Sequence, residues 1–327
     1  MKIAIAGNTS AAYYCLEKLC RANFDVVSVF VPDKNIIQSN HTADFNSLSG
    51  EFDFEQIIVS SGKTTDNNYK IDLLIKLEWP NELSIPIVPS IGILGSNLEG
   101  QYKEDCLTDI AANIYKGDSK FECQITLESM DELNVNTASL ASNRTLPKIL
   151  DSYQVEINLF DDVHSAKIKV VAHYYMHLIE MLKIIQADKT MPTIIEKDYY
   201  RNSIRTEKII NWNESTKIIY NHVRSLTHYG DSAFTYYDNE IIKIWRGHPF
   251  ESNNGNNEKN KPGSIVDIFN DIGVLVKTGD GVFLITRLQF SGAPELPSWV
   301  WAENFHVKPF EMFGDLKKDE IVLEHDK

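Results

Sequence analysis

The first third of the chain restricts the fold most, because apolar runs of strand length recur there with helix-forming segments between them. The opening run KIAIAG predicts a buried strand, and the turn GNTS leads from it into an amphipathic segment. A second strand, DVVSVFVP, ends at Pro32, and the runs QIIVSS and IDLLIKLEW follow. This spacing is typical of parallel strands joined by crossovers, so the first half is predicted to be a doubly wound α/β domain.

The first helix is predicted directly after the first strand, where Asn8 or Ser10 can cap it. A strand, a short turn and a helix in this order are the usual opening of a parallel α/β sheet. The apolar side chains of the helix recur on one face, which comprises Ala12, Cys15, Leu16, Leu19 and Cys20.

The character of the sequence changes near residue 209. The long helical segment VVAHYYMHLIEMLKIIQ closes the first part. A helix in NESTKIIYNHVRSL then precedes short strands, which are separated by turn signals at Asp238-Asn239 and Asp280-Gly281. Several short strands with a tight hairpin predict a small β-barrel. We therefore expect two domains, residues 1–203 and residues 204–327, with an aromatic-rich C-terminal extension that covers the barrel.

Charge and composition restrict the partners. The 327 residues include 32 Lys and Arg against 46 Asp and Glu, which gives a formal net charge of −14. A chain this acidic repels phosphate backbones and anionic membrane surfaces, so neither nucleic acid nor membrane is expected as the main partner. The N-terminus lacks the apolar run of a signal peptide and no later run approaches a membrane span, so a cytoplasmic protein is expected.

Three patterns could carry chemistry, but each has a plainer structural interpretation. His173, His177 and Glu180 have helical spacing and could face one way as metal ligands, yet bulky apolar residues separate them, as on a packed helix face. The loop SSGKTT lacks the leading glycine of a phosphate-binding loop, because Ile57 stands at that position. The four cysteines show no zinc-like spacing, so no metal site is expected.

A resemblance to a known family rests on one segment at the front of the chain and five at the back. MKIAIAGNTSAAYYCLEKL opens the chain, and YYRNSIRTEKIINWNES, VRSLTHYGDSAF, IIKIWRG, PGSIV and GDGVFLITRLQ follow in order near its end. Their order and spacing resemble the formyltransferase family, whose members pass a formyl group from 10-formyltetrahydrofolate to an amine on methionyl-tRNA or on a nucleotide-linked amino sugar. The resemblance implies a Rossmann-like catalytic domain followed by an OB-like β-barrel domain.

The resemblance also implies a catalytic triad, in which the central sheet presents Asn-x-His and a later loop supplies Asp. The amine must lose a proton as it attacks, so the His acts as base, while the Asn holds the oxyanion and the Asp orients the His. Laid on this motif, GILGSN places Gly95 at the Asn position and Asn97 at the His position, and LNVNTASLA places Asn136 at the Asp position. The alternative register, IPIVPS, gives Ile87 and Pro89.

Neither register contains a histidine, and the chain has none between His41 and His164. An Asn side chain cannot take a proton near neutral pH, so the usual mechanism is expected to be weak or absent. The residues that the resemblance assigns to binding of 10-formyltetrahydrofolate are Leu77, Trp79, Gly92 and Asn136.

Three functions remain open. The first is a working formyltransferase for a nucleotide-linked amino sugar, with His173 or Glu99 as the base. Methionyl-tRNA is disfavoured as the acceptor, because residues 205–327 contain 14 Lys or Arg and 18 Asp or Glu, a net charge of −4. The second is a non-catalytic relative that binds a ligand, a partner protein or a second copy of itself. The third is different chemistry in the same pocket.

Overall fold

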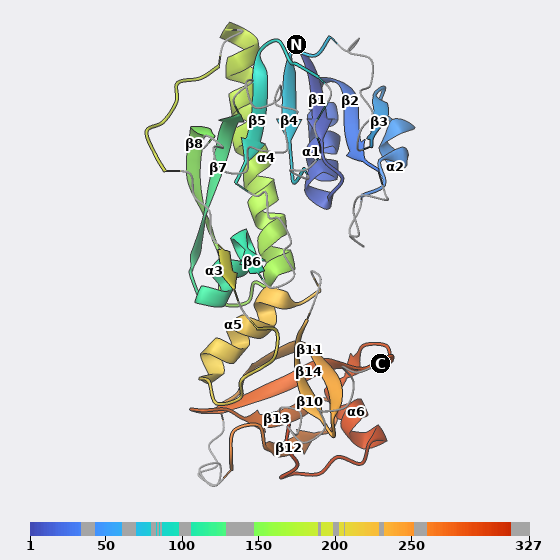
Figure 1. The fold of residues 1–327 in the computed structure, drawn as a ribbon, viewed down its shortest axis with the longest axis vertical. Helices are drawn as coiled ribbons and strands as arrows, with labels where there is room; N and C mark the ends of the chain where they lie inside the picture. Colours follow the sequence, from blue (N-terminus) through green and yellow to red (C-terminus); the bar gives the residue numbers. More distant parts are fainter. Residues whose placement is uncertain are drawn as a thin grey trace, which may run out of the picture. The chain divides into compact units, whose positions relative to one another are not determined.

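The chain divides into two compact units. The computed structural model describes residues 1–33, 43–60, 70–79, 83, 85, 87–97, 106–128, 147–188, 191–198, 203–205, 207–228, 232–251 and 260–314 (Figure 1). Unit 1 comprises Met1–Glu104, Lys120–Glu156 and Lys167–Ser203. Unit 2 comprises Asp105–Ser119, Ile157–Ala166 and Ile204–Lys327, so it takes in two short segments from the first part of the chain.

Unit 1 is built on a seven-stranded mixed sheet with the order β3-β2-β1-β4-β5-β7-β8. The order reverses between β1 and β4, as in doubly wound sheets, and this confirms the predicted α/β class. The carboxyl ends of the five consecutive parallel strands meet at one edge. β7 continues the sheet antiparallel to β5, and β8 pairs antiparallel with β7. The five parallel strands are β1 (Lys2–Ala6), β2 (Asp25–Pro32), β3 (Glu55–Val59), β4 (Leu73–Lys76) and β5 (Gly92–Ser96), and they are followed in the sheet by β7 (Lys120–Glu128) and β8 (Lys148–Glu156).

Helices α1 (Ser10–Arg21) and α4 (Val163–Asp188) cover one face of this sheet (Figure 1). They contact each other where the Tyr175 hydroxyl donates to the Lys18 carbonyl at 3.1 Å. The cap of α1 is Thr9, whose hydroxyl accepts a backbone hydrogen bond at 3.5 Å, so the predicted caps at Asn8 or Ser10 were wrong by one residue. None of the helices in the described part of the chain combines the length and the apolar character that a transmembrane segment needs.

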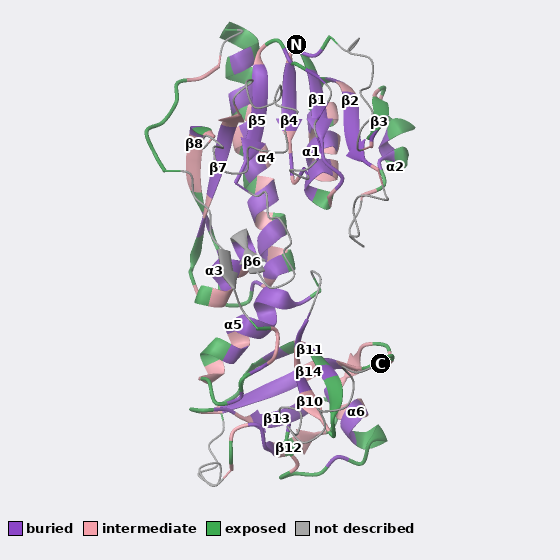
Figure 2. Cartoon of the chain, in the orientation of Figure 1, coloured by how far each residue is buried: buried purple, intermediate pink, exposed green. Residues whose placement is uncertain are grey.

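The opposite face of the parallel strands is covered by the chain that follows β4. The side chains of Trp79, Leu83, Ile85 and Ile87 pack there in one buried cluster with residues of the strands. Figure 2 shows the resulting burial along the central strands. Because the parallel strands are buried on both faces, their sequences are nearly continuous apolar runs instead of alternating patterns. A short helix, α2 (Asn46–Ser49), precedes β3.

Unit 2 is built on a six-stranded antiparallel sheet with the order β10-β11-β14-β13-β12, to which β15 adds beside β14. The predicted turns are present: Asp238 and Asn239 join β10 to β11 at φ values of 50° and 66°, and the chain reverses at Asp280-Gly281 between β13 and β14. The strands are β10 (Ala233–Tyr237), β11 (Glu240–Pro249), β12 (Ile265–Phe269), β13 (Gly273–Lys277), β14 (Val282–Phe290) and β15 (Leu296–Pro297).

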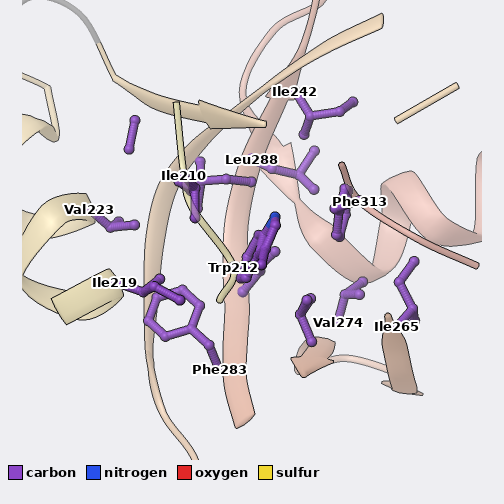
Figure 3. Close-up of a cluster of buried hydrophobic side chains, with 14 of the residues drawn as sticks. Ile210, Trp212, Ile219, Val223, Ile242, Ile265, Val274, Phe283, Leu288 and Phe313 are labelled. Carbon is purple, nitrogen blue, oxygen red and sulfur yellow. The ribbon is translucent and has the colours of Figure 1, made fainter. Parts of the chain in front are cut away.

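The core of unit 2 is rich in aromatic side chains. Figure 3 labels Trp212 and Phe313 in this cluster, whose rings stack with centroids 5.9 Å apart. Phe313 also stacks on Trp301, with ring centroids 5.7 Å apart. Phe313 and Trp301 come from the aromatic-rich C-terminal stretch, so that stretch contributes to the core itself as well as covering it. The remaining elements are α3 (Asp109–Lys116), α5 (Thr216–Leu226), α6 (Ser298–Asn304) and a two-stranded sheet of β6 (Cys106–Thr108) and β9 (Ser203–Arg205).

The strand pairings of unit 2 do not form the closed barrel that was predicted. Within the described residues, the path of paired strands is open between its ends, β10 and β12. One C-terminal segment, residues 311–314, lies against both ends, because Gly314 bridges Tyr236 of β10 and Met312 bridges Ser264 just before β12. The sheet is therefore joined across its opening by isolated bridges and not by a regular ladder.

Helix α5 of unit 2 is capped at its amino end by the Ser215 side chain. The Ser215 hydroxyl accepts a hydrogen bond from the Ile218 N–H at 3.3 Å. Ser215→Ala is expected to lower the free energy of unfolding by about 1 kcal/mol, because that backbone donor loses its partner. Urea denaturation checks this, with Ser291→Ala in an exposed loop as the control that should change stability by less than about 0.5 kcal/mol. Equal effects of the two substitutions would contradict the cap.

Candidate functional site at the carboxyl end of the parallel strands

The structure places Gly95 and Asn97 together at the carboxyl end of β5. Ligand sites in doubly wound sheets lie at this edge. Gly95 is paired with Thr126 on β7, and Ser96 with Ile125, so the antiparallel strand runs directly beside the predicted catalytic positions. Asn136, the third predicted position, lies outside the described residues, as do Glu99 and residues 61–65 of the SSGKTT loop.

Asn97 is engaged with the backbone of β7. Its side-chain amide donates to the Glu122 carbonyl at 2.7 Å, and its side-chain oxygen accepts from the Gln124 N–H at 2.7 Å. The residue is only 2% exposed. Its side chain thus extends the β5–β7 pairing beyond the end of β5. A buried amide held by a donor and an acceptor of the backbone has a structural role and supplies no base.

The space above Gly95 is occupied by a carboxylate. A Cβ atom at this position would lie 2.7 Å from Glu128 Oε1 and 2.9 Å from Thr126 Oγ1. The other carboxylate oxygen, Oε2, accepts from Lys76 Nζ at 2.8 Å. An ion pair between Lys76 on β4 and Glu128 on β7 therefore fills the space that a side chain at position 95 would need.

The residues predicted to bind a folate are packed into the core where the structure describes them. Leu77 is buried, and Trp79 is 3% exposed, with its indole N–H donating to the Leu83 carbonyl at 2.7 Å. Gly92 lies at the amino end of β5, where a Cβ would be 2.5 Å from Met191 Cε. It is thus three residues, about 10 Å, from Gly95. Leu77 and Trp79 therefore offer no exposed side-chain surface to a folate, and Gly92 has no side chain to offer.

An imidazole–carboxylate pair lies on β8 and α4. His177 Nδ1 is 2.7 Å from Asp151 Oδ2, and the imidazole stacks on Tyr153 with ring centroids 3.6 Å apart. The Cys123 thiol donates to the Tyr153 hydroxyl at 3.0 Å, and burial raises the pKa of Cys123 to about 12 and that of Tyr153 well above its usual range. The thiol is thus no nucleophile near neutral pH.

The His177–Asp151 pair does not replace the missing histidine of β5. β8 lies two strands from β5, which is about 10 Å across the sheet. The sequence analysis missed the pairing because the two residues are on different elements and 26 positions apart. His173 and Glu180 are exposed on α4, and no group of three or more His, Cys, Asp or Glu in the described part of the chain could hold a metal ion.

A second ion pair, also missed from the sequence, lies just beyond β4. Glu78 has a left-handed backbone at φ 50°, and its Oε1 is 2.5 Å from Lys167 Nζ on α4. Its Oε2 is buried and has no hydrogen-bond partner among the described residues. The pKa of the Cys15 thiol is raised to about 12, mainly by burial and to a smaller extent by the charge of Glu78. The sheet edge thus carries charged groups that a simple motif search does not find.

Comparison with known proteins agrees with this architecture. Residues 203–306 match the model of the formyl transferase C-terminal domain. The chain is 25% identical to methionyl-tRNA formyltransferase of Desulforamulus reducens over 203 residues, which is 61% of this chain and 62% of that protein. It is 25% identical to the enzyme of the same name from a Sulfurihydrogenibium species over 320 residues, which is 96% of this chain and 100% of that protein.

Two solved structures share the fold. HypX from Aquifex aeolicus superposes with a TM-score of 0.57 at 13% identity, over 95% of this chain and 48% of that one. WlaRD, a sugar 3N-formyltransferase, superposes with a TM-score of 0.53 at 14% identity, over 90% of this chain and 99% of that one. This chain therefore spans about half the length of HypX, and less than two thirds of the Desulforamulus relative.

These observations together define the class of protein. The mixed doubly wound sheet of unit 1 and the matched C-terminal domain are those of a formyltransferase-type α/β protein. The match of residues 203–306 and the methionyl-tRNA formyltransferase relatives support a member of the formyltransferase family.

Proposed function

We propose that this protein keeps the formyltransferase scaffold to bind a nucleotide-linked amino sugar, and that it transfers formyl groups weakly or not at all. One observation carries the proposal: the Asn97 side chain is bonded to the Glu122 carbonyl and the Gln124 N–H, both at 2.7 Å. A side chain held in this way can neither take a proton from an amine nor turn toward a substrate. Loss of the general base costs about 100- to 10,000-fold in rate.

The choice of acceptor is supported by the relatives and by charge. WlaRD was solved in the presence of dTDP and 5-N-formyl-THF, and an N-formyltransferase from Helicobacter canadensis, which shares the fold with a TM-score of 0.53, with folinic acid and dTDP-3-aminofucose. Residues 205–327 of this chain carry a net charge of −4, which disfavours a tRNA. A sugar nucleotide needs only a few cations.

The one-carbon donor in this proposal is 10-formyltetrahydrofolate, by analogy with these relatives and with HypX, which was solved in complex with tetrahydrofolic acid. When bound, this donor would supply the formyl group. The packing of Leu77, Trp79 and Gly92 gives no support for binding through their side chains. The proposal also includes an OB-like barrel in unit 2, completed by the segment 311–314 that bridges both open strands.

The test mixes the purified protein with 10-formyltetrahydrofolate and a panel of nucleotide-linked amino sugars, and follows tetrahydrofolate release. We expect turnover at least about 100-fold slower than that of a sugar N-formyltransferase that has Asn-x-His. Calorimetry with the same sugars and with dTDP alone is expected to show binding. Turnover at the rate of the reference enzyme would overturn the proposal, and so would a failure to bind any sugar nucleotide.

The non-catalytic version of this proposal, a relative that binds ligand without turnover, is favoured by a second observation. Gly95 has no side chain, and the Glu128 carboxylate fills the place of the oxyanion donor. An anion cannot stabilise another negative charge at this point. Binding of sugar nucleotide with no detectable tetrahydrofolate release would select this version.

A further inference from the structure

We infer that Lys76 and Glu128, at the ends of β4 and β7, form the binding site for the amino group of the acceptor. The inference rests on the proposed function, because it names the residues that would recognise the amine of the nucleotide-linked sugar. Glu128 is paired with Ile93, and its side chain reaches along the sheet to Gly95 and to Lys76, the last residue of β4. Ligands of doubly wound sheets bind at the carboxyl ends of the parallel strands, so the proposed function places the amine of the acceptor beside this pair.

The two oxygens of the Glu128 carboxylate have different surroundings. Oε2 accepts a hydrogen bond from Lys76 Nζ at 2.8 Å. Oε1 lies over the backbone of Gly95, and no residue in the described part of the chain donates a hydrogen bond to it. The side chains are 15% and 17% exposed, so the pair is shielded but can be reached from solvent. A carboxylate oxygen in this setting is stabilised by a new N–H donor.

A neighbouring ion pair shows what a purely structural arrangement looks like here. Glu122, on the same strand, binds Lys197 at 2.9 Å. Its Oε1 also accepts from Gln124 Nε2 at 3.0 Å and from Ser152 Oγ at 3.1 Å, so three donors surround one oxygen. Among the residues that the structure describes, Glu128 has one side-chain partner, Lys76. The contrast identifies Glu128 as the carboxylate with spare hydrogen-bonding capacity.

Gly95 is what makes the arrangement possible. Any side chain at this position would begin 2.7 Å from Oε1, closer than carbon and oxygen normally approach, and would displace the carboxylate. Because glycine has no side chain, position 95 lacks the Asn that the resemblance predicts there, and the Glu128 carboxylate has room to lie beside it.

The chemistry of the pair suits a neutral primary amine. Glu128 Oε1 can accept one amine N–H, and the Lys76 ammonium can donate to an adjacent oxygen of the sugar. The Lys76 charge offsets part of the preference of the carboxylate for a protonated amine. Binding in this way would orient the amine without requiring a histidine.

The experiment compares two ligands by calorimetry: a dTDP-linked 3-amino sugar and the 3-deoxy sugar that lacks the amino group. The protein is expected to bind the amino sugar about 10-fold more tightly, the effect of one hydrogen bond to a charged group. Glu128→Gln, which keeps an oxygen for Lys76, is expected to lose most of this preference. Glu122→Gln is the matched control on the same strand and is expected to keep it.

The outcomes separate the inference from the proposed function. Equal binding of the two ligands by the unaltered protein, or an undiminished preference in Glu128→Gln, overturns the inference and leaves the proposed sugar-nucleotide binding intact. Failure of both ligands to bind overturns the proposed function and the inference with it. If Glu128→Gln does not fold, Gly95→Ala provides the test, because its methyl group would push Oε1 aside and is expected to remove the preference.

Discussion

Replacing Asn97 with histidine, the residue that the sequence resemblance predicts for this position, is expected to destabilise the protein and not to restore catalysis. The expected loss in the free energy of unfolding is about 2–4 kcal/mol. It arises because the Glu122 carbonyl and the Gln124 N–H would both lose their partner at a buried position, and each buried polar group left unsatisfied costs about 1–3 kcal/mol. An imidazole cannot present its two nitrogens to both groups as the planar amide does.

Urea denaturation measures this loss, and tetrahydrofolate release measures any gain in activity. Asn46→His is the matched control, because Asn46 is exposed in α2 of the same unit and should tolerate the substitution within about 0.5 kcal/mol. Unchanged stability of Asn97→His together with faster turnover would mean that the site has room for the imidazole. This result would contradict the structural role that we assign to Asn97.

The packing around Gly95 and Asn97 also limits any attempt to rebuild the predicted catalytic triad by mutation. Gly95→Asn would bring its Cβ within 2.7 Å of Glu128 Oε1, so the ion pair with Lys76 would have to move. Exchanging Gly95, Asn97 and Asn136 for the Asn, His and Asp of the family motif would therefore meet two local obstacles. Both obstacles come from β7, a strand that the motif does not include.

The sheet of unit 1 could be predicted from sequence because its signal is local. Strands buried on both faces need long apolar runs, and the first helix needs a cap and one apolar face, so each element carries its own pattern. The predicted caps, Asn8 and Ser10, differ from the observed cap, Thr9, by one residue. All three side chains are polar, and only the backbone geometry decides which of them caps the helix. The open strand path of unit 2 could not be predicted, since hairpin patterns do not specify which distant edges pair.

The candidate site could be predicted only in part, for a related reason. Alignment to a motif finds positions such as Gly95 and Asn97, which lie in one short stretch. It does not find Lys76 and Glu128, because they are 52 positions apart and only the pairing of β4, β5 and β7 brings them over the same glycine. Periodicity predicts that a residue faces one side of a sheet, but not which polar group meets it there.

Stability is expected to fall as the pH is lowered from 6.5 to 5, mainly because of His222 in unit 2. Burial lowers the pKa of His222 from 6.5 to about 4 and outweighs a hydrogen bond with the Glu207 backbone, which raises it. Its Nε2 is buried with no hydrogen-bond partner in the part of the chain that the structure describes. Its ring packs edge-on against Tyr115 with centroids 5.5 Å apart. Between these two pKa values the unfolded chain binds a proton that the folded protein excludes, so acid favours unfolding.

The expected loss is about 2 kcal/mol between pH 6.5 and 5, at about 1.4 kcal/mol for each pH unit. Carboxylates with lowered pKa, such as Asp72 and Asp280, lose their contribution mostly below about pH 5, so this window isolates the histidine. Urea denaturation at several pH values measures the slope. His222→Gln should flatten it whatever its stability at pH 7, whereas His248→Gln, at an exposed position, should leave most of it. A slope that survives in His222→Gln would mean that His222 is protonated in the folded protein.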